Sequence, residues 1–269
     1  MMHVKGWRAR KEQSLQRECL EIGPDRRRIV VRYRDGGQPG VVWLGGYRSD
    51  MAGTKAVAID AWCAGMGVAC CRHDYSGHGE SGGSFRDGSI SRWVEESLAV
   101  LERFTRGAQI LVGSSMGAWI ALRMARILAE RGEGERLAAM LLIAPAPDFT
   151  ERLMWPNLTP AQKRQIESEG FLQEPSRYSP EPDIYTRVLF EDGRRNLVME
   201  SEVVTHCPVH IIQGRLDPDV PWQHAVELAS RMASENVTMT LVPDGDHRLS
   251  RDSDIALIIE ALSRLRQQA

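Results

Sequence analysis

The stretch that decides the fold is Ile110-Leu-Val-Gly-Ser-Ser-Met-Gly-Ala-Trp119. Its apolar start is typical of a buried strand, the residues from Met116 onward have helical spacing, and the pattern Gly-x-Ser-x-Gly lies between them. Gly113 and Gly117 bracket Ser115, so the turn can be tight enough to force strained dihedrals on the serine. The pattern predicts that Ser115 is a nucleophile at the start of a helix, whose free backbone amides can stabilise an oxyanion.

Strand-like and helix-like segments alternate along the rest of the chain. Strands are expected at residues 28–34, 41–44, 68–72, 110–112, 138–144, 209–212 and 237–242, and helices at 55–66, 90–104, 116–128, 222–232 and 254–265. The first two strands flank the turn signal Asp35-Gly36-Gly37 and are expected to form an antiparallel pair. The later alternation predicts an α/β fold with a mainly parallel sheet and helices on both faces.

The stretch from Asp148 to His206 interrupts this alternation. It shows no strand pattern, is polar, and contains prolines at positions 156, 160, 175, 180 and 182. A plain loop of this length is unusual in a compact domain, so we expect a helical insertion over one end of the sheet, here called the lid segment (residues 148–206). Because there is no internal repeat or linker, residues 1–269 are expected to form one domain that carries this insertion.

Composition argues against several classes of function. Lys and Arg total 34 and Asp and Glu total 36, so no overall positive field would attract nucleic acid or an anionic membrane. No apolar run reaches the ~18 residues of a membrane helix, and the N-terminus lacks the apolar core of a signal peptide. Glu12 and Glu18 argue against a transit peptide, so a cytoplasmic location is expected. The five cysteines lack the spacing of a zinc site, and no metal is expected.

The partners of a serine nucleophile in this kind of turn are expected after it, first an acid and then a histidine. Asp217 follows a strand and can orient an imidazole, with Asp219 as the rival carboxylate. His247 lies in a turn-rich loop directly after the final strand. These positions predict a triad of Ser115, Asp217 and His247, while Ser114 lies one residue too early in the turn to compete.

Two backbone amides are expected to form the oxyanion hole. Tyr47 lies in the exposed segment that follows a strand, and Met116 directly follows the nucleophile. His73, His78 and His210 are expected to have structural roles.

Several side chains are candidates for binding the substrate, mostly because they are aromatic and lie in the lid segment or near the nucleophile. They are Trp119, Phe149, Trp155, Tyr178, Trp222 and Arg248. Packing of the lid segment against the core is the alternative role for the aromatic ones, and a surface ion pair is the alternative for the arginine.

Four motifs in this order resemble the α/β-hydrolase superfamily. They are Gly45-Gly-Tyr47, Asp74-Tyr-Ser-Gly-His-Gly79, Gly113-Ser-Ser-Met-Gly117, and Asp217 with His247. Three further motifs resemble the branch that contains acyl-protein thioesterases and acyl-glucuronide esterases with their bacterial relatives: Gly53-Thr-Lys-Ala56, Val220-Pro-Trp222 and Asp246-His-Arg248.

This resemblance implies an α/β-hydrolase fold and hydrolysis of a carboxylic ester or thioester through an acyl-enzyme, with no metal and no organic cofactor. The substrate would be a small acyl compound or an acylated protein. A small-substrate serine peptidase or amidase and a non-catalytic binding protein of the same fold are the alternatives, and the oligomeric state stays open.

Overall fold

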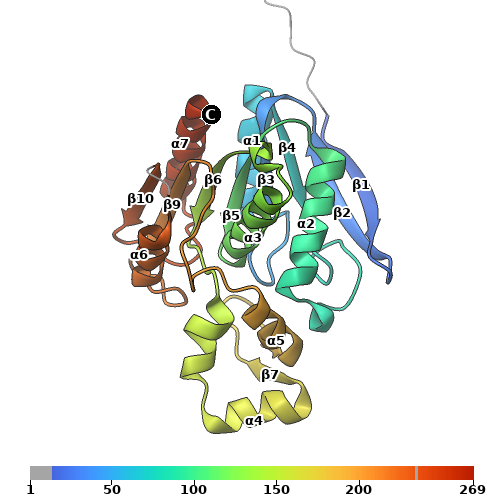
Figure 1. Cartoon of the computed structure of the whole chain (residues 1–269), viewed down its shortest axis with the longest axis vertical. Helices are drawn as coiled ribbons and strands as arrows, with labels where there is room; N and C mark the ends of the chain where they lie inside the picture. The colour runs from blue at the N-terminus through green and yellow to red at the C-terminus, as the bar shows by residue number, and fades with distance from the viewer. Residues whose placement is uncertain (1–13, 234–235) are drawn as a thin grey trace, which may run out of the picture.

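The computed structural model describes residues 14–233 and 236–269 (Figure 1). Within this part of the chain, eight strands form one sheet in the order β1-β2-β4-β3-β5-β6-β9-β10. Their bounds are Gln16–Ile22 (β1), Arg27–Arg34 (β2), Gly37–Leu44 (β3), Val68–His73 (β4), Gln109–Ser114 (β5), Leu137–Ile143 (β6), Val209–Gly214 (β9) and Val237–Val242 (β10). All neighbours from β4 to β10 in this order are parallel, which confirms the expected mainly parallel sheet.

The expected antiparallel pairing of the first two predicted strands is wrong. β2 pairs with β1 and β4, and β3 lies on the far side of β4. The turn between β2 and β3 passes the start of β4, where the Gly37 amide donates to the Gly67 carbonyl at 2.8 Å. A Cβ at Gly36 would lie 2.3 Å from the carbonyl carbon of Val68, so the chain crosses the end of β4 there. Both antiparallel partners of β2 are therefore other strands, β4 and β1, and β1 is an edge strand whose mostly exposed side chains give no strand pattern.

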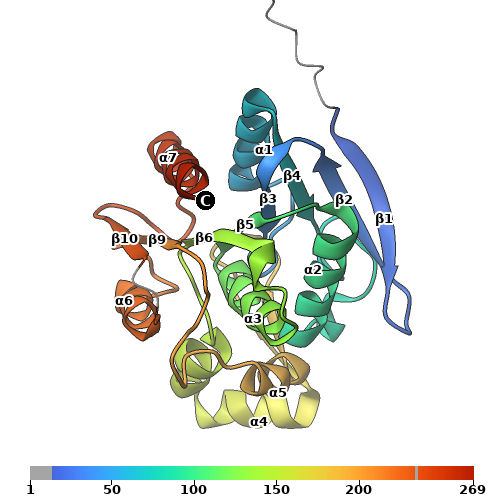
Figure 2. The ribbon, with the colours of Figure 1, turned by 45° about the horizontal axis from the view of Figure 1, so that its top comes forward.

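Helices cover both faces of the sheet (Figures 1 and 2). α1 (Thr54–Met66) and α7 (Asp252–Gln268) pack on one face, and α2 (Ile90–Phe104), α3 (Met116–Glu130) and α6 (Trp222–Arg231) pack on the other. Successive strand residues point to opposite faces, so in β3 Val41 joins the core under α1 and α7 while Val42 joins the core under α3. The expected coverage of both faces is confirmed.

The lid segment leaves the sheet after β6 and returns before β9. It contains a turn of π-helix at Thr150–Met154, α4 (Pro160–Glu169), α5 (Arg187–Arg195) and an antiparallel pair of strands, β7 (Phe171–Glu174) and β8 (Asp183–Thr186). Figure 1 shows α4, α5 and β7 projecting beyond the sheet. The insertion is helical in part, and the β7-β8 pair was not expected because four-residue strands are too short to give a recognisable pattern.

Asp148 ties the two ends of the lid segment together. Its buried carboxylate accepts hydrogen bonds from the backbone amides of Val198 at 2.9 Å and Met199 at 2.8 Å. The point where the chain leaves the sheet is therefore joined to the stretch that leads back to it. Throughout residues 14–233 and 236–269, every helix is too short or too polar to span a membrane.

Candidate active site

Ser115 occupies the junction between β5 and α3. Its backbone has φ 54° and ψ −118°, in the left-handed half of the map, so the expected strain on this residue is present. A Cβ at Gly117 would lie 2.1 Å from the Leu44 carbonyl oxygen, and one at Gly113 would lie 2.6 Å from the Gly117 carbonyl oxygen. Glycine at both positions therefore lets α3 begin directly behind the strand, with the serine at the turn.

Three side chains from distant segments form a chain of hydrogen bonds at this turn. His247 Nε2 lies 3.0 Å from Ser115 Oγ, and His247 Nδ1 lies 2.8 Å from Asp217 Oδ2. The Asp217 side chain is fully buried, and the imidazole keeps 16% of its surface exposed. The structure thus brings together the three residues that the sequence predicted as a triad.

The Asp217 carboxylate is held ionised by its hydrogen bonds. Burial opposes ionisation, but the His247 hydrogen bond and the backbone amides of Val220 (2.8 Å) and Asp219 (2.9 Å) keep its pKa below the usual value. Gln213 Nε2 donates a further bond to Oδ2 at 3.0 Å. Because the carboxylate can only accept, Nδ1 of His247 carries the proton, and Nε2 is free to accept from the serine hydroxyl.

The rival candidates have other partners. Asp219 accepts a hydrogen bond from the Tyr178 hydroxyl. Buried His73 faces Ser97 Oγ at 3.2 Å, while His210 faces Thr238 Oγ1 at 2.6 Å on the neighbouring strand.

Among the described residues, the group with the spacing of metal ligands is Asp217, Asp219 and His247, whose ligand atoms lie within 4.8 Å of one another. Both imidazole nitrogens of His247 are already engaged, by Asp217 and by Ser115. A metal would have to break one of those two hydrogen bonds to gain the histidine as a ligand.

The two expected oxyanion donors lie on either side of the serine. Met116 is the first residue of α3, and a Cβ at Gly46, beside Tyr47, would lie 3.4 Å from the Cβ of Ser115. In the described part of the chain, neither the Tyr47 amide nor the Met116 amide has a hydrogen-bond acceptor. Both N–H groups are therefore available to an oxygen that approaches Ser115.

Two substrate-binding candidates, Phe149 and Trp119, lie near the loop that carries Tyr47. The Phe149 ring is 5.9 Å from the Tyr47 ring and 5.6 Å from the Trp119 ring, centre to centre. Trp119 is fully buried, and its indole donates to the Asn196 carbonyl at 2.9 Å. These rings connect α3, the loop that carries Tyr47 and the lid segment.

Tyr178 and Arg248 lie beside the histidine. The Tyr178 ring is 6.5 Å from the His247 ring, and the Arg248 guanidinium is 5.9 Å from the centre of the Tyr178 ring. The lid segment therefore reaches the imidazole side of the site as well.

The remaining two candidates are Trp155 and Trp222. Trp155 belongs to a small core inside the lid segment, with its ring 5.3 Å from Phe190, and Trp222 is the half-buried first residue of α6. A surface cavity of about 460 Å³ between α6 and the base of the lid segment is lined by Glu151, Arg152, Leu153, Pro221, Gln223, His224 and Glu227, and so by none of the predicted residues.

Two contacts next to the site were not anticipated. Lys55 Nζ donates to the carbonyl of Arg248, the residue after His247, and burial together with Arg248 lowers the pKa of Lys55 to about 8. His78 Nε2 accepts the Arg48 amide, next to Tyr47, at 3.2 Å. The only signal in the sequence was that both residues lie in the motifs Gly53-Thr-Lys-Ala56 and Asp74-Tyr-Ser-Gly-His-Gly79.

Comparison with known proteins gives matches along most of the chain. Residues 38–261 match the alpha/beta hydrolase family. Human palmitoyl-protein thioesterase ABHD10, mitochondrial, is 32% identical over 243 residues, covering 90% of this chain and 78% of that protein. A crystal structure of an Agrobacterium vitis S4 protein is 49% identical with a TM-score of 0.90, covering 94% of this chain and 99% of that one. Mouse alpha/beta hydrolase domain-containing protein 10 is 31% identical with a TM-score of 0.82, covering 94% and 98%.

The expected cytoplasmic location is wrong by this comparison, because the curated relatives are named mitochondrial proteins. The expectation used Glu18 as an argument against a transit peptide, but Glu18 lies in β1, inside the folded sheet. An acidic residue within the folded part carries no information about a leader sequence. Glu12, the other acidic residue used, lies outside the described residues.

Proposed function

Because this chain belongs to the alpha/beta hydrolase family, we propose that it hydrolyses carboxylic esters or thioesters through an acyl intermediate on Ser115. The resemblance seen in the sequence is confirmed at the level of the family, as is the expectation of a hydrolase. The observation that carries the proposal is the continuous hydrogen-bond chain of 2.8 Å from Asp217 to His247 and 3.0 Å from His247 to Ser115. This order of groups is the one that activates a serine hydroxyl.

In the first step, Ser115 Oγ forms a bond to the substrate carbonyl carbon while His247 Nε2 takes the hydroxyl proton. The carbonyl oxygen becomes an oxyanion and accepts hydrogen bonds from the Tyr47 and Met116 amides. One such donor is typically worth about 3–4 kcal/mol of transition-state stabilisation. Asp217 stabilises the imidazolium through the Nδ1 hydrogen bond.

When the tetrahedral intermediate collapses, the bond to the alcohol or thiol breaks and His247 gives its proton to that leaving group. Ser115 then carries the acyl group as an ester. His247 Nε2 next removes a proton from water, which attacks the acyl carbon. Collapse of this second intermediate returns the proton to Ser115 Oγ and releases the carboxylic acid.

The lid segment, as part of one catalytic domain, selects the acyl group in this proposal. In the proposed complex the acyl chain packs against Phe149, whose ring lies 5.9 Å from the Tyr47 ring and rests on the fully buried Trp119 ring at 5.6 Å. The relatives named palmitoyl-protein thioesterases support a medium or long acyl chain, on a small molecule or on a protein.

Replacing Ser115 by alanine tests the assignment of the nucleophile. The variant is expected to lose hydrolysis of 4-nitrophenyl esters to near background while keeping the melting temperature of the wild type. A fluorophosphonate probe should modify Ser115 in the native protein and fail after heating. If Ser115→Ala keeps its esterase activity, the nucleophile is another residue.

A series of esters from acetyl to palmitoyl tests the acyl group. We expect kcat/KM to rise beyond the acetyl ester, and a steady preference for acetyl would contradict an apolar acyl site. Matched thioester and amide substrates in the same assay separate a thioesterase from an amidase. The ester and the thioester should be hydrolysed much faster than the amide.

A further inference from the structure

The loop that follows β3 and carries Tyr47 is held by the loop that follows β4. The Arg48 amide donates to His78 Nε2 at 3.2 Å, and the Met51 amide donates to Asp74 Oδ1 at 2.7 Å. We propose that His78 is a positioning residue for the oxyanion hole, because it fixes the peptide that follows Tyr47 and so directs the Tyr47 amide toward Ser115. This inference rests on the proposed function.

Arg48 is the residue in this loop that needs such support. Its φ of 56° lies in the left-handed region, where a residue with a side chain is strained. The strain falls directly after the proposed oxyanion donor. A hydrogen bond to the Arg48 amide therefore favours the one loop conformation that leaves the Tyr47 amide without an internal partner.

The protonation of His78 follows from its two partners. Its Nδ1 lies 3.2 Å from the Ser76 carbonyl oxygen, which can only accept, so Nδ1 carries the proton. Its Nε2 faces an amide that can only donate, so Nε2 carries none. The ring is consequently neutral, and burial lowers its pKa to about 4. At physiological pH the acceptor is always present.

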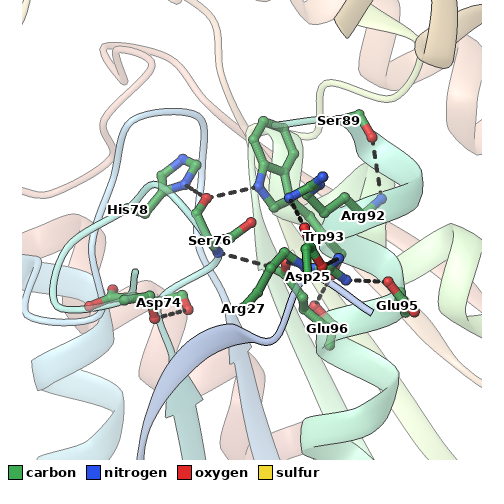
Figure 3. A network of polar contacts seen from close by, with 12 residues as sticks. Asp25, Arg27, Asp74, Ser76, His78, Ser89, Arg92, Trp93, Glu95 and Glu96 are labelled. Atoms are coloured by element: carbon green, nitrogen blue, oxygen red, sulfur yellow. Dashed lines mark hydrogen bonds and ion pairs between the residues drawn. The ribbon is translucent and has the colours of Figure 1, made fainter. Parts of the chain in front are cut away.

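Ser76, which orients His78, is itself fixed by a buried network (Figure 3). The Ser76 carbonyl also accepts from the Trp93 indole at 3.2 Å, and the Ser76 amide donates to Glu96 Oε2 at 2.9 Å. Glu96 is fully buried and pairs with Arg27 Nε at 2.7 Å. This chain of contacts runs from β2 and α2 to the imidazole, so the acceptor is held by rigid elements.

The residues on either side of His78 are glycines that this loop conformation requires. Gly77 has φ 75°, and a Cβ there would lie 2.5 Å from Phe85 Cα. Gly79 has φ 45°, and a Cβ there would lie 2.1 Å from the Asp74 carboxylate. The ring contacts Phe85 and two other aromatic side chains, with centres 5.1–5.5 Å apart. Phenylalanine would suit these neighbours as well, and what histidine adds is the acceptor.

Two substitutions separate the acceptor from the packing. His78→Phe keeps an aromatic ring and removes the acceptor, whereas His78→Gln offers a carboxamide oxygen near the position of Nε2. We expect His78→Phe to lower kcat for a 4-nitrophenyl ester about 10- to 100-fold with KM within about twofold, because misplacing one catalytic contact by about 1 Å has effects of this size. His78→Gln should recover kcat to within about fivefold of the wild type.

Inhibition by a transition-state analogue is a measurement that a purely structural role of His78 would leave unchanged. An alkyl trifluoromethyl ketone accepts Ser115 Oγ at its carbonyl carbon, and its oxygen becomes the oxyanion. Its inhibition constant should weaken in His78→Phe by about the same factor as kcat. If His78→Phe does not fold, His78→Leu replaces it, since leucine is smaller and also lacks the acceptor.

The inference is overturned if the variant without an acceptor keeps kcat within about threefold of the wild type. It is equally overturned if KM rises while kcat and inhibition by the ketone stay unchanged, or if His78→Gln is as impaired as His78→Phe. An inactive wild type, or an active Ser115→Ala variant, would instead refute the proposed function. The two failures are therefore distinguishable.

Discussion

Replacing Asp217 by asparagine should nearly abolish hydrolysis, although asparagine has almost the same size and shape as aspartate. The two carboxylate oxygens have different partners. Oδ1 accepts from the backbone amides of Asp219 at 2.9 Å and Val220 at 2.8 Å, and these donors cannot reverse. In Asp217→Asn the carboxamide oxygen must take this position, which puts the NH₂ group at the Oδ2 position, opposite His247 Nδ1.

The size of the decrease in kcat follows from the group that His247 Nδ1 faces in this variant. For Nε2 to accept the Ser115 proton, Nδ1 must carry a hydrogen, and that hydrogen would point at another donor. Two buried donors without acceptors cost about 1–3 kcal/mol each, and the lost charge-assisted bond to the imidazolium is worth about 1.5–3 kcal/mol. The sum is about 3.5–9 kcal/mol, and its lower half, about 4–6 kcal/mol, corresponds to a decrease in kcat of about 10³- to 10⁴-fold, the size that this substitution has in a serine triad.

The assay is steady-state hydrolysis of a 4-nitrophenyl ester, with thermal unfolding to verify the fold. Asp219→Asn is the matched control, because its carboxylate lies close to His247 but accepts a hydrogen bond from the Tyr178 hydroxyl. We expect the control to keep kcat within about fivefold of the wild type. An Asp217→Asn variant with more than a tenth of the wild-type activity, beside an inactive Asp219→Asn, would refute the reasoning and make Asp219 the acid.

Three other perturbations test the surroundings of the site. Gly117→Ala should destabilise the protein by about 1–3 kcal/mol or more, since its Cβ would meet a backbone oxygen at 2.1 Å. Gly65→Ala is the control, because Gly65 has open space around it in α1, and it should stabilise the protein by about 0.5–1 kcal/mol. Equal effects of the two substitutions in calorimetry would contradict the close packing at Gly117. Burial lowers the pKa of His73 to about 3, so the native state binds fewer protons than the unfolded state, and the free energy of unfolding should fall by up to about 1.4 kcal/mol per pH unit below pH 6.5. Urea titrations should find a smaller fall in His73→Gln, and identical slopes would contradict a neutral buried ring. Lys55→Met should lower kcat about tenfold with little change in KM, because the loop of the catalytic histidine loses its tether to α1; an unchanged kcat would make that bond irrelevant to catalysis.

The sheet shows which parts of the fold a sequence pattern can predict. The buried parallel strands and their helices were expected close to their observed positions, because each has a strong apolar pattern of its own. β1 was not expected because its residues are mostly exposed, and β7 and β8 were not expected because they are short. The position of β3 beyond β4 depends on pairings between distant segments, which a local pattern does not contain.

The residues of the candidate site also differ in whether the sequence could predict them. Ser115, Asp217 and His247, which the structure brings within hydrogen-bond distance, could be predicted together because each follows a strand in the order that this kind of turn requires. His78 and Lys55 contact the neighbouring loops through single hydrogen bonds to backbone atoms. Every residue type has a backbone, so the sequence does not reveal such a partner. Trp155 was expected near the substrate, but its ring contacts lie within the lid segment.

By itself, the sequence determined the alternation of strands and helices, the strained turn at Ser115 and the order of Asp217 and His247 behind it. These features depend on backbone sterics and apolar spacing, which act over a few neighbouring residues. Only the tertiary structure decided which strands are neighbours, how the lid segment returns to the sheet, and which side chain holds the loop that carries Tyr47. These three features depend on contacts between residues far apart in the chain. Such contacts form only when the whole molecule packs, so no local pattern predicts them.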